Sequence, residues 1–223
     1  NLDLLKKVEP QIDDSLPYLT IDNKEITQNH LNSLFEFEQI NRLLEKINSF
    51  GNKFLEIGAG DGRTAKTVMS LKNNIKYVIA DIPPAITICK NNLEKIFPRK
   101  KILNAFDISD KAVLNKALNE NEVLFIFPHQ IKLFEKKTFD ISIAIDCLHE
   151  MEKKIIKRYM EDFESVSKSL YFKVWEYAAL PYSFYRHFSV HKQEDYSIKN
   201  NWKEHFKERC LYPSNYFQLG YEF

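Results

Sequence analysis

The chain has 223 residues, a length that one α/β domain can fill. Its 32 Lys and Arg nearly balance its 31 Asp and Glu, so a net charge of +1 provides no global field for a nucleic-acid backbone or an anionic membrane surface. Apolar residues make up 44% and aromatic residues 13%, which is enough to bury a full core and excludes a disordered chain.

Before residue 53 the sequence predicts a single helix. Residues 1–27 show no regular pattern. Between residues 29 and 49, apolar side chains recur at helical spacing, and Gly51 ends the pattern. We therefore expect residues 1–50 to form an N-terminal helical extension.

From residue 53 onward, strand-like and helix-like segments alternate. The expected strands are 53–57, 76–81, 123–127, 139–146 and 170–175. Helical patterns follow at 64–71, after the two prolines at 83 and 84, and at 152–168. This alternation indicates right-handed crossovers, and therefore a parallel sheet with helices on both faces.

Two segments depart from this rhythm. Residues 98–121 are predicted to be an insertion that contains a short helix capped by Ser109. After residue 176 the pattern predicts a helix at 202–210 and then a terminal strand at 217–223, which we expect to be antiparallel. The predicted fold is a single domain over 1–223, a doubly wound, Rossmann-like α/β architecture with a mostly parallel sheet of seven strands.

The cysteines and the apolar runs bear on compartment and membrane. Cys89, Cys147 and Cys210 are an odd number without CxxC spacing, which argues against a disulfide framework and a thiolate zinc site. No apolar run approaches the ~18 residues that cross a bilayer. We expect a cytoplasmic protein with no membrane span.

The residues most informative about function are 56–63 (EIGAGDGR), where a predicted strand ends and a helix begins. Glycines there permit a tight turn and let a ligand approach the backbone without meeting a Cβ. The helix that follows presents unpaired N–H groups and the positive end of its dipole, which suits a carboxylate or a phosphate. In an open parallel sheet, ligands bind at this end of the strands, at the switch point.

The glycine spacing separates two classes of cofactor. The dinucleotide fingerprint GxGxxG needs a third glycine at the position of Arg63. The segment instead resembles E-x-G-x-G-x-G, the first motif of class I S-adenosylmethionine-dependent methyltransferases. Asp81, which ends the next predicted strand, supplies the carboxylate expected at the ribose hydroxyls, although it also fits a dinucleotide enzyme. Alternatively, the turn binds no cofactor and Asp81 only caps the helix that starts at Pro83.

Four segments resemble a narrower family, the sugar O-methyltransferases. They are 54–63 (FLEIGAGDGR), 77–84 (YVIADIPP), 125–130 (FIFPHQ) and 140–151 (DISIAIDCLHEM). The resemblance covers residues 30–175, including Tyr159, and extends loosely to Trp202. Asp61, which is often aromatic in that family, and residues 146–147, where Ser or Asn is more usual, depart from the pattern.

This resemblance implies S-adenosyl-L-methionine as the cofactor. The residues implied to bind it are Glu56, Gly58, Gly60, Arg63, Asp81, Ile82, His129 and Asp146. His129 is expected near the adenine, although a loop histidine is often only solvated, and Asp146 is expected beside the methionine portion. Arg63 has two alternative partners, a carboxylate of the cofactor or one of the protein.

Methyl transfer from a sulfonium is an in-line displacement, so most of the enzyme's contribution is to hold the acceptor oxygen in line. A sugar hydroxyl is a weak acid, and a positioned base would help by roughly 10²–10⁴-fold. The resemblance favours Glu150 as this base, whereas the intrinsic pKa favours His149. Alternatively, His149 caps the helix that begins at Glu152, and Glu150 only favours that helix's N-terminus electrostatically.

Aromatic and basic residues follow the fifth predicted strand, where they suit an acceptor site or ordinary core packing. They are Tyr177, Tyr182, Tyr185, Arg186 and His187. His187 and His191 are spaced i, i+4 without a neighbouring carboxylate motif, so we expect no metal site.

The sequence thus predicts an S-adenosylmethionine-dependent O-methyltransferase acting on a sugar or glycoconjugate hydroxyl. The expected partner is a small molecule or a glycan, and no nucleic acid. One alternative is a methyltransferase for another small-molecule oxygen or nitrogen. A second is a non-catalytic binding protein that keeps the cofactor fold, and a third is a dehydrogenase.

Overall fold

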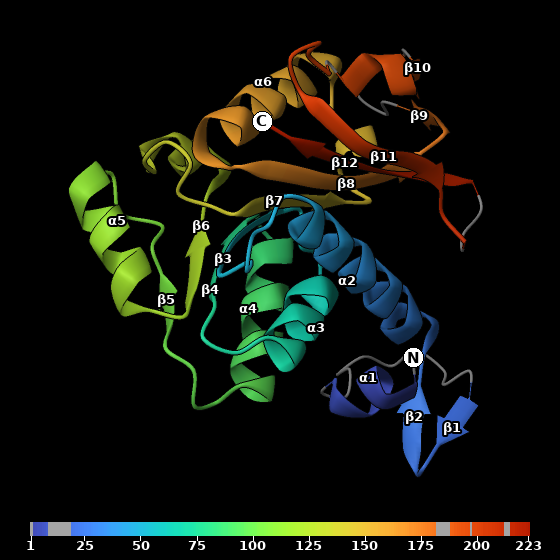
Figure 1. Cartoon of the computed structure of the whole chain (residues 1–223). Coiled ribbons are helices and arrows are strands. Elements are labelled where there is room, and N and C mark those ends of the chain that lie inside the picture. The colour runs from blue at the N-terminus through green and yellow to red at the C-terminus, as the bar shows by residue number, and fades with distance from the viewer. Residues whose placement is uncertain (1, 9–18, 182–187, 197, 212–214) are drawn as a thin grey trace.

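The computed structural model describes residues 2–8, 19–181, 188–196, 198–211 and 215–223. An eight-stranded sheet in the order β11-β12-β8-β7-β3-β4-β6-β5 runs through the described part (Figure 1). Its strands are β3 (Lys53–Ile57), β4 (Lys76–Ala80), β5 (Ile102–Asn104), β6 (Val123–Ile126), β7 (Ile141–Ile145), β8 (Ser169–Trp175), β11 (Lys203–Arg209) and β12 (Tyr216–Glu222). Every neighbouring pair from β5 to β8 is parallel, and β12 is antiparallel to both β8 and β11.

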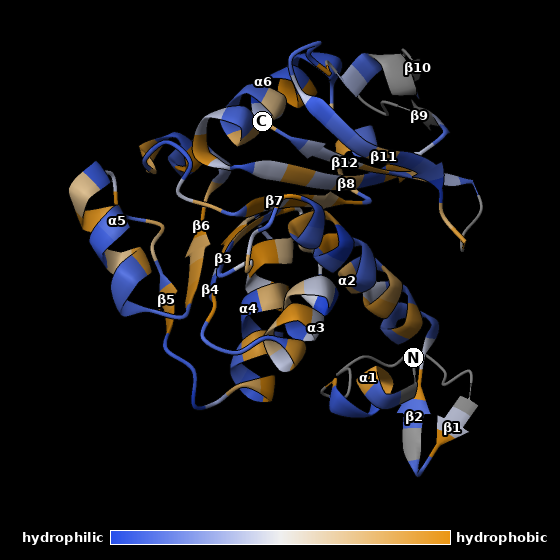
Figure 2. Ribbon diagram, viewed as in Figure 1, coloured by the Kyte–Doolittle hydropathy of each residue, from blue (hydrophilic) through white to orange (hydrophobic). Residues whose placement is uncertain are grey.

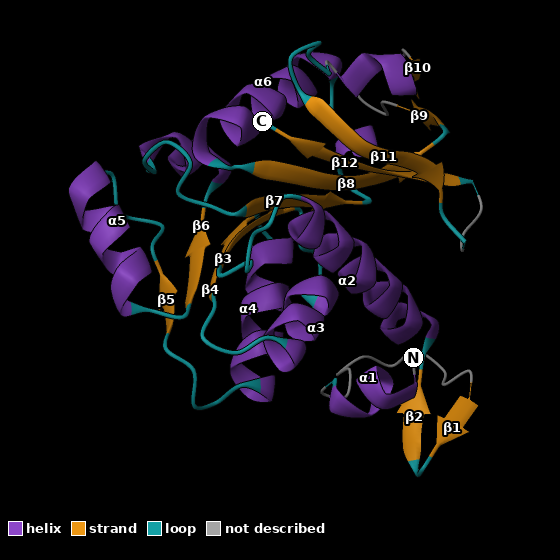
Figure 3. Ribbon diagram, viewed as in Figure 1, coloured by secondary structure: helices purple, strands orange, loops and turns teal. Residues whose placement is uncertain are grey.

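Helices cover both faces of the sheet (Figure 3). They are α2 (Gln28–Lys46), α3 (Arg63–Leu71), α4 (Ala85–Ile96), α5 (Lys111–Glu120) and α6 (Lys153–Val166). Strand residues alternate between two apolar clusters, because successive side chains point to opposite faces. Leu55 and Val78 pack with α5 and α6, whereas Phe54 and Tyr77 pack with α2, α3 and α4. The central strands are accordingly mostly apolar (Figure 2).

This architecture confirms the predicted doubly wound α/β fold with an antiparallel C-terminal strand, although the sheet has eight strands where seven were expected. The helix predicted at 202–210 is wrong, since this segment forms β11. Phe206 is the strand's buried residue, and its ring lies 2.6 Å from where a Cβ would stand on Gly220 of β12. Pairing with β12 therefore overrides the local helical pattern.

The segments predicted as an extension and an insertion contain short elements. Residues 1–27, expected to be irregular, include α1 (Leu2–Lys7) and the hairpin of β1 (Leu19–Ile21) and β2 (Lys24–Ile26). Residues 98–121 include β5 and α5, and α5 is capped by Asp110 rather than by the predicted Ser109. The division of the chain into a domain, an extension and an insertion stays a prediction.

The described residues include one further hairpin and several short turns. A separate antiparallel hairpin consists of β9 (Tyr177–Pro181) and β10 (Phe188–Lys192). Three 3₁₀ turns are η1 (Pro128–Leu133), η2 (Leu148–Glu150) and η3 (Gln193–Tyr196). Within the described ranges, no helix combines the length and the apolar character needed to cross a membrane.

Candidate functional site

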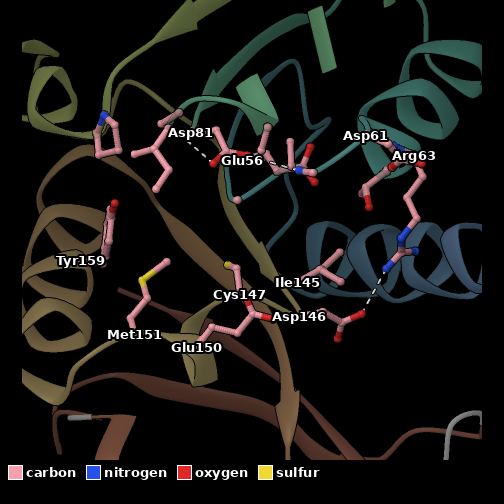
Figure 4. A pocket seen from close by; sticks show the side chains of 18 of the residues that line it. Glu56, Asp61, Arg63, Asp81, Ile145, Asp146, Cys147, Glu150, Met151 and Tyr159 are labelled. Atoms are coloured by element: carbon pink, nitrogen blue, oxygen red, sulfur yellow. Dashed lines mark hydrogen bonds and ion pairs between the residues drawn. The ribbon is translucent and has the colours of Figure 1, made fainter. Parts of the chain in front are cut away.

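A cavity of about 730 Å³, termed here the main cavity, opens at the carboxyl ends of β3, β4 and β7 (Figure 4). The chain leaves β3 toward β4 on one side and returns to β7 on the other, so the cavity lies at the topological switch point of the sheet. The side chains that line it include Glu56, Asp61, Arg63, Asp81, Ile82, Pro128, Asp146, Cys147, Glu150, Met151 and Tyr159.

The glycine turn forms the first wall of the main cavity. Gly58 and Gly60 both have positive φ, at 63° and 59°, a backbone conformation that other L-residues adopt only with strain. A Cβ on Gly58 would stand 2.5 Å from Cβ of Cys147, so this position also needs glycine for packing. A Cβ on Gly60 would meet nothing within 4 Å, which leaves its backbone open to a ligand.

Asp81 is held by the backbone of the same wall. Its Oδ2 accepts a hydrogen bond of 3.2 Å from Gly60 N–H, and its Oδ1 accepts one of 2.7 Å from Ile82 N–H. Burial raises the pKa of Asp81, although these backbone donors oppose the shift. Because a carboxylate can accept about four hydrogen bonds, Asp81 retains acceptor capacity for a ligand.

Glu56 lies beneath the turn and is fully buried. Its Oε2 accepts a hydrogen bond of 2.8 Å from the hydroxyl of Tyr77, which projects from β4. Burial raises the pKa of Glu56 to about 8, so this carboxyl is mainly protonated at neutral pH.

Four ionic side chains, termed here the ion quartet, stand at the opposite wall, where two half-buried members line the cavity and two buried members lie behind them. They are Glu36 of α2, Arg63 of α3, Asp146 after β7 and Lys173 of β8. Arg63 donates to both oxygens of Glu36, at 2.5 and 3.0 Å, and to Asp146 Oδ2 at 3.2 Å. Lys173 donates to Glu36 Oε1 at 2.9 Å and lies 3.7 Å from Asp146 Oδ2. The sequence left the partner of Arg63 open, and in the structure it pairs with carboxylates of the protein.

The quartet leaves one acceptor atom of Asp146 without a partner. Asp146 Oδ1 is buried and makes no hydrogen bond to the described residues. The residue has a φ of 57°, a strained conformation for a residue other than glycine. Burial raises its pKa to about 6, against the opposing charges of Lys173 and Arg63. This oxygen therefore suits a ligand that donates a hydrogen bond, above all a cationic one.

The net charge of the lining favours a cationic ligand. Asp61, Asp81, Asp146 and Glu150 contribute carboxylates, whereas Arg63 is the single cation among the lining residues that the structure describes. Its guanidinium is already paired with Glu36, so it offers little to the anionic pyrophosphate of a dinucleotide.

The two candidate bases lie differently with respect to the main cavity. Glu150 lines it from η2, and burial raises the pKa of its carboxyl. His149 is buried behind the lining and stacks on Trp175 with ring centroids 5.1 Å apart. Burial, aided by His191, lowers the pKa of His149 to about 4. The geometry thus brings Glu150, and not the neighbouring imidazole, to the cavity.

The other predicted cofactor residues divide in the same way. Ile82 lines the main cavity and is 62% exposed, so an apolar surface is available there to a ring. His129 is exposed and lies outside the lining, where Pro128 takes its place. Tyr159, which the family resemblance includes, lines the cavity from α6.

Sequence reasoning missed Glu36 and Lys173, each only 3% exposed at its side chain. Glu36 interrupts the apolar stripe of α2, and Lys173 stands inside the apolar run LYFKVW of β8. A charged residue at such a position is the signal that was available, because buried charges are rare without a partner.

Most residues of the predicted acceptor cluster cannot be placed relative to the main cavity. Tyr182, Tyr185, Arg186 and His187 lie outside the described residues. Tyr177 is exposed and is not part of the lining of the main cavity. Among the described residues, no three His, Cys, Asp or Glu side chains are grouped so that they could hold a metal ion.

No protein-family model matches the chain, and no curated protein matches its sequence. Solved structures do resemble its fold. Magnesium protoporphyrin IX methyltransferase from Synechocystis PCC 6803, solved with SAH bound, superposes with a TM-score of 0.59 at 11% identity, over 99% of this chain and 93% of that chain. The PH0226 protein from Pyrococcus horikoshii OT3 gives a TM-score of 0.56 at 16% identity, over 88% and 92%.

A third similar structure is an S-adenosylmethionine-dependent methyltransferase from Clostridium acetobutylicum ATCC 824, with a TM-score of 0.54 at 9% identity, over 86% and 90%. At these identities the likeness establishes the fold alone. The chain has the Rossmann-like fold that these methyltransferases share.

Proposed function

We propose that this chain is an S-adenosylmethionine-dependent methyltransferase that acts on a hydroxyl of a sugar or glycoconjugate. The observation that carries the cofactor is the acidic main cavity at the switch point, with Asp81 fixed across the glycine turn by Gly60 N–H. The cofactor is a sulfonium with an ammonium group and a ribose diol. A cavity rich in carboxylates and without an unpaired cation among its described lining matches those groups.

The residues of the cavity fit the cofactor one by one. Asp81 would accept the ribose hydroxyls, and Ile82 would lie against the adenine. The unpartnered Oδ1 of Asp146 would accept from the ammonium group, and Gly60 leaves room for the ligand at the turn. When bound, the cofactor supplies an electrophilic methyl group.

The chain's own contribution to the chemistry is to position the acceptor and to take its proton. Glu150 borders the cavity beside Met151 and across from Tyr159, in the part remote from Asp81 (Figure 4). Its raised pKa makes it a better base than an ordinary carboxylate, so we assign it the proton of the acceptor hydroxyl. The four sequence segments that resemble sugar O-methyltransferases support a sugar as the acceptor.

Calorimetric titration of the full chain with S-adenosylmethionine tests the cofactor. We expect binding that Asp81→Asn weakens by roughly 10–100-fold, because hydrogen bonds to a charged acceptor are lost. Asp61→Asn is the matched control, since it removes one negative charge from the same lining but not the proposed diol acceptor. No heat with the wild-type chain, or preferential binding of a nicotinamide dinucleotide, would contradict the proposal.

Turnover with a panel of glycosides, followed by release of S-adenosylhomocysteine, tests the acceptor and the base. We expect Glu150→Gln to lower kcat by roughly 10²–10⁴-fold while the affinity for S-adenosylmethionine is kept. His149→Phe, which retains an aromatic ring against Trp175, should lower kcat far less. If the cofactor binds but no glycoside is methylated, the sugar assignment fails and the binding-protein alternative gains.

A further inference from the structure

A second cavity, termed here the α2 cavity, is lined by residues of α2, β8, β11 and β12. Its volume is about 320 Å³, at the lower end of the range for ligand pockets. It is lined by Asn32, Phe35, Glu36, Gln39, Lys173, Glu208, Arg209, Cys210, Leu211 and Gln218. None of these residues lines the main cavity.

The ion quartet forms the contact between the two cavities. Glu36 and Lys173 line the α2 cavity, whereas Arg63 and Asp146 line the main cavity. The four groups are joined by the hydrogen bonds described above, so the two spaces are adjacent but do not merge. A ligand in the α2 cavity would not need to displace one in the main cavity.

The charges of the α2 cavity are balanced. Its lining includes two carboxylates and two cations, together with three neutral amides, from Asn32, Gln39 and Gln218. This balance disfavours a polyanion or a polycation, and the density of polar groups disfavours a lipid chain. A neutral ligand with many hydroxyl groups meets the lining best, because the amides can both donate to and accept from such groups and the carboxylates can accept from them.

The polar side chains of the cavity are held in place. Gln218 donates to Glu208 at 3.1 Å, and Arg42 donates to Glu208 at 2.5 Å and to Gln39 at 2.9 Å. Tyr171 donates to Gln218 at 3.3 Å. Such fixed groups bind a ligand at a low cost in conformational entropy.

One polar atom of the lining is left without a partner. Asn32 Oδ1 is shielded from water and makes no hydrogen bond to the described residues. Apolar surface accompanies it, since Phe35 is 42% exposed and Leu211 is 85% exposed. An exposed aromatic ring beside amide and carboxylate groups can pack on the apolar face of a sugar ring.

We propose that the α2 cavity is a carbohydrate-binding site, sized for a single sugar unit and distinct from the main cavity. Asn32 donates to or accepts from the sugar hydroxyls, and Phe35 packs on the ring. The proposal goes beyond methyl transfer, because sugar binding here needs neither the cofactor nor a base. Where the acceptor is a glycoconjugate, the α2 cavity would hold a second sugar unit of the same glycan.

The test is a titration of the full chain with the methyl glycosides of glucose, galactose and mannose, observed by NMR without S-adenosylmethionine. We expect at least one glycoside to bind, with a Kd on the order of 1 mM. Asn32→Leu should weaken glycoside binding about fivefold or more, because it removes hydrogen bonds to the ligand. Because Asn32 Oδ1 has no partner in the described structure, this variant should leave the thermal midpoint of unfolding nearly unchanged.

Phe35→Ala should weaken binding of the same glycoside. Its control is Phe50→Ala, which alters an exposed aromatic residue outside both linings and should leave this binding unchanged. Binding that survives Asp81→Asn but not Asn32→Leu supports the proposal. Absence of binding for all three glycosides, or binding lost in Asp81→Asn and kept in Asn32→Leu, overturns it. Failure of the chain to bind S-adenosylmethionine would overturn the proposed function and leave this result intact.

Discussion

The two walls of the main cavity hold their carboxylates by different means. On the glycine-turn side, Asp81 is fixed by the backbone N–H groups of Gly60 and Ile82. On the β7 side, Asp146 is fixed by the side chains of Arg63 and Lys173, which Glu36 binds in turn. Both aspartates follow a parallel strand of the same sheet, and yet one is held by backbone N–H groups and the other by side chains from three distant segments.

This difference indicates which substitutions each wall of the main cavity tolerates. A backbone donor cannot be removed by a side-chain substitution, so the first wall is sensitive mainly to changes in its glycines. Behind the second wall the charges of Glu36 and Lys173 are buried, and each depends on its partners to offset the free energy of desolvation. Three predictions follow this contrast, from the largest expected effect to the smallest.

Removing Glu36 should have the largest effect on stability. Glu36→Gln leaves Arg63 and Lys173 with Asp146 as their remaining partner in the quartet, and breaking a buried ion pair in this way costs roughly 3–5 kcal/mol. Urea denaturation of the variant measures the loss in the free energy of unfolding. Arg42→Gln is the control, because the Arg42–Glu208 pair is substantially exposed and should contribute no more than about 1 kcal/mol. Equal losses in the two variants would show that the quartet is not a buried network.

Alanine substitutions at Gly58 and Gly60 should destabilise the fold to different extents. Gly58→Ala combines positive φ with a Cβ only 2.5 Å from Cβ of Cys147, and should cost about 3 kcal/mol of unfolding free energy. Gly60→Ala has the same backbone strain without a clash, and should cost about 1 kcal/mol. Thermal and chemical denaturation compare the pair. A cost for Gly60→Ala that matches or exceeds the other would contradict the packing argument.

Glu56 should make the stability of the fold depend on pH across the neutral range. Its pKa is raised from 4.5 to about 8 in the folded chain, so the folded state binds a proton that the unfolded state has lost. The corresponding stability is fully present below pH 4.5 and is lost as the pH rises toward and through about 8. Glu56→Gln should remove this portion of the pH profile, so the variant should gain stability over the wild-type chain progressively as the pH rises from 4.5 to about 8. Unfolding free energies at a series of pH values would test this, and an unchanged profile would refute it.

The sequence determined the features that depend on short stretches of chain. The alternation of strands and helices predicted the doubly wound sheet, because each element's apolar pattern is set by its own residues. The glycine turn and Asp81 could be found for the same reason, since a strand end and a backbone turn are local. The segment 140–151 was enough to predict Glu150 as a candidate base, but the sequence could not decide between Glu150 and His149.

Only the tertiary structure decided the remainder. The direction of the turn at η2 places Glu150 at the cavity and His149 in the core, although the two residues are adjacent in the chain. The segment 202–210 becomes a strand because β12 offers it backbone partners that no local pattern reveals. The ion quartet joins residues 36, 63, 146 and 173, and a buried charge is stable only when its distant partner is present. Neighbouring residues therefore determine the backbone geometry of the turn, whereas buried charges pair only when folding has brought distant segments together.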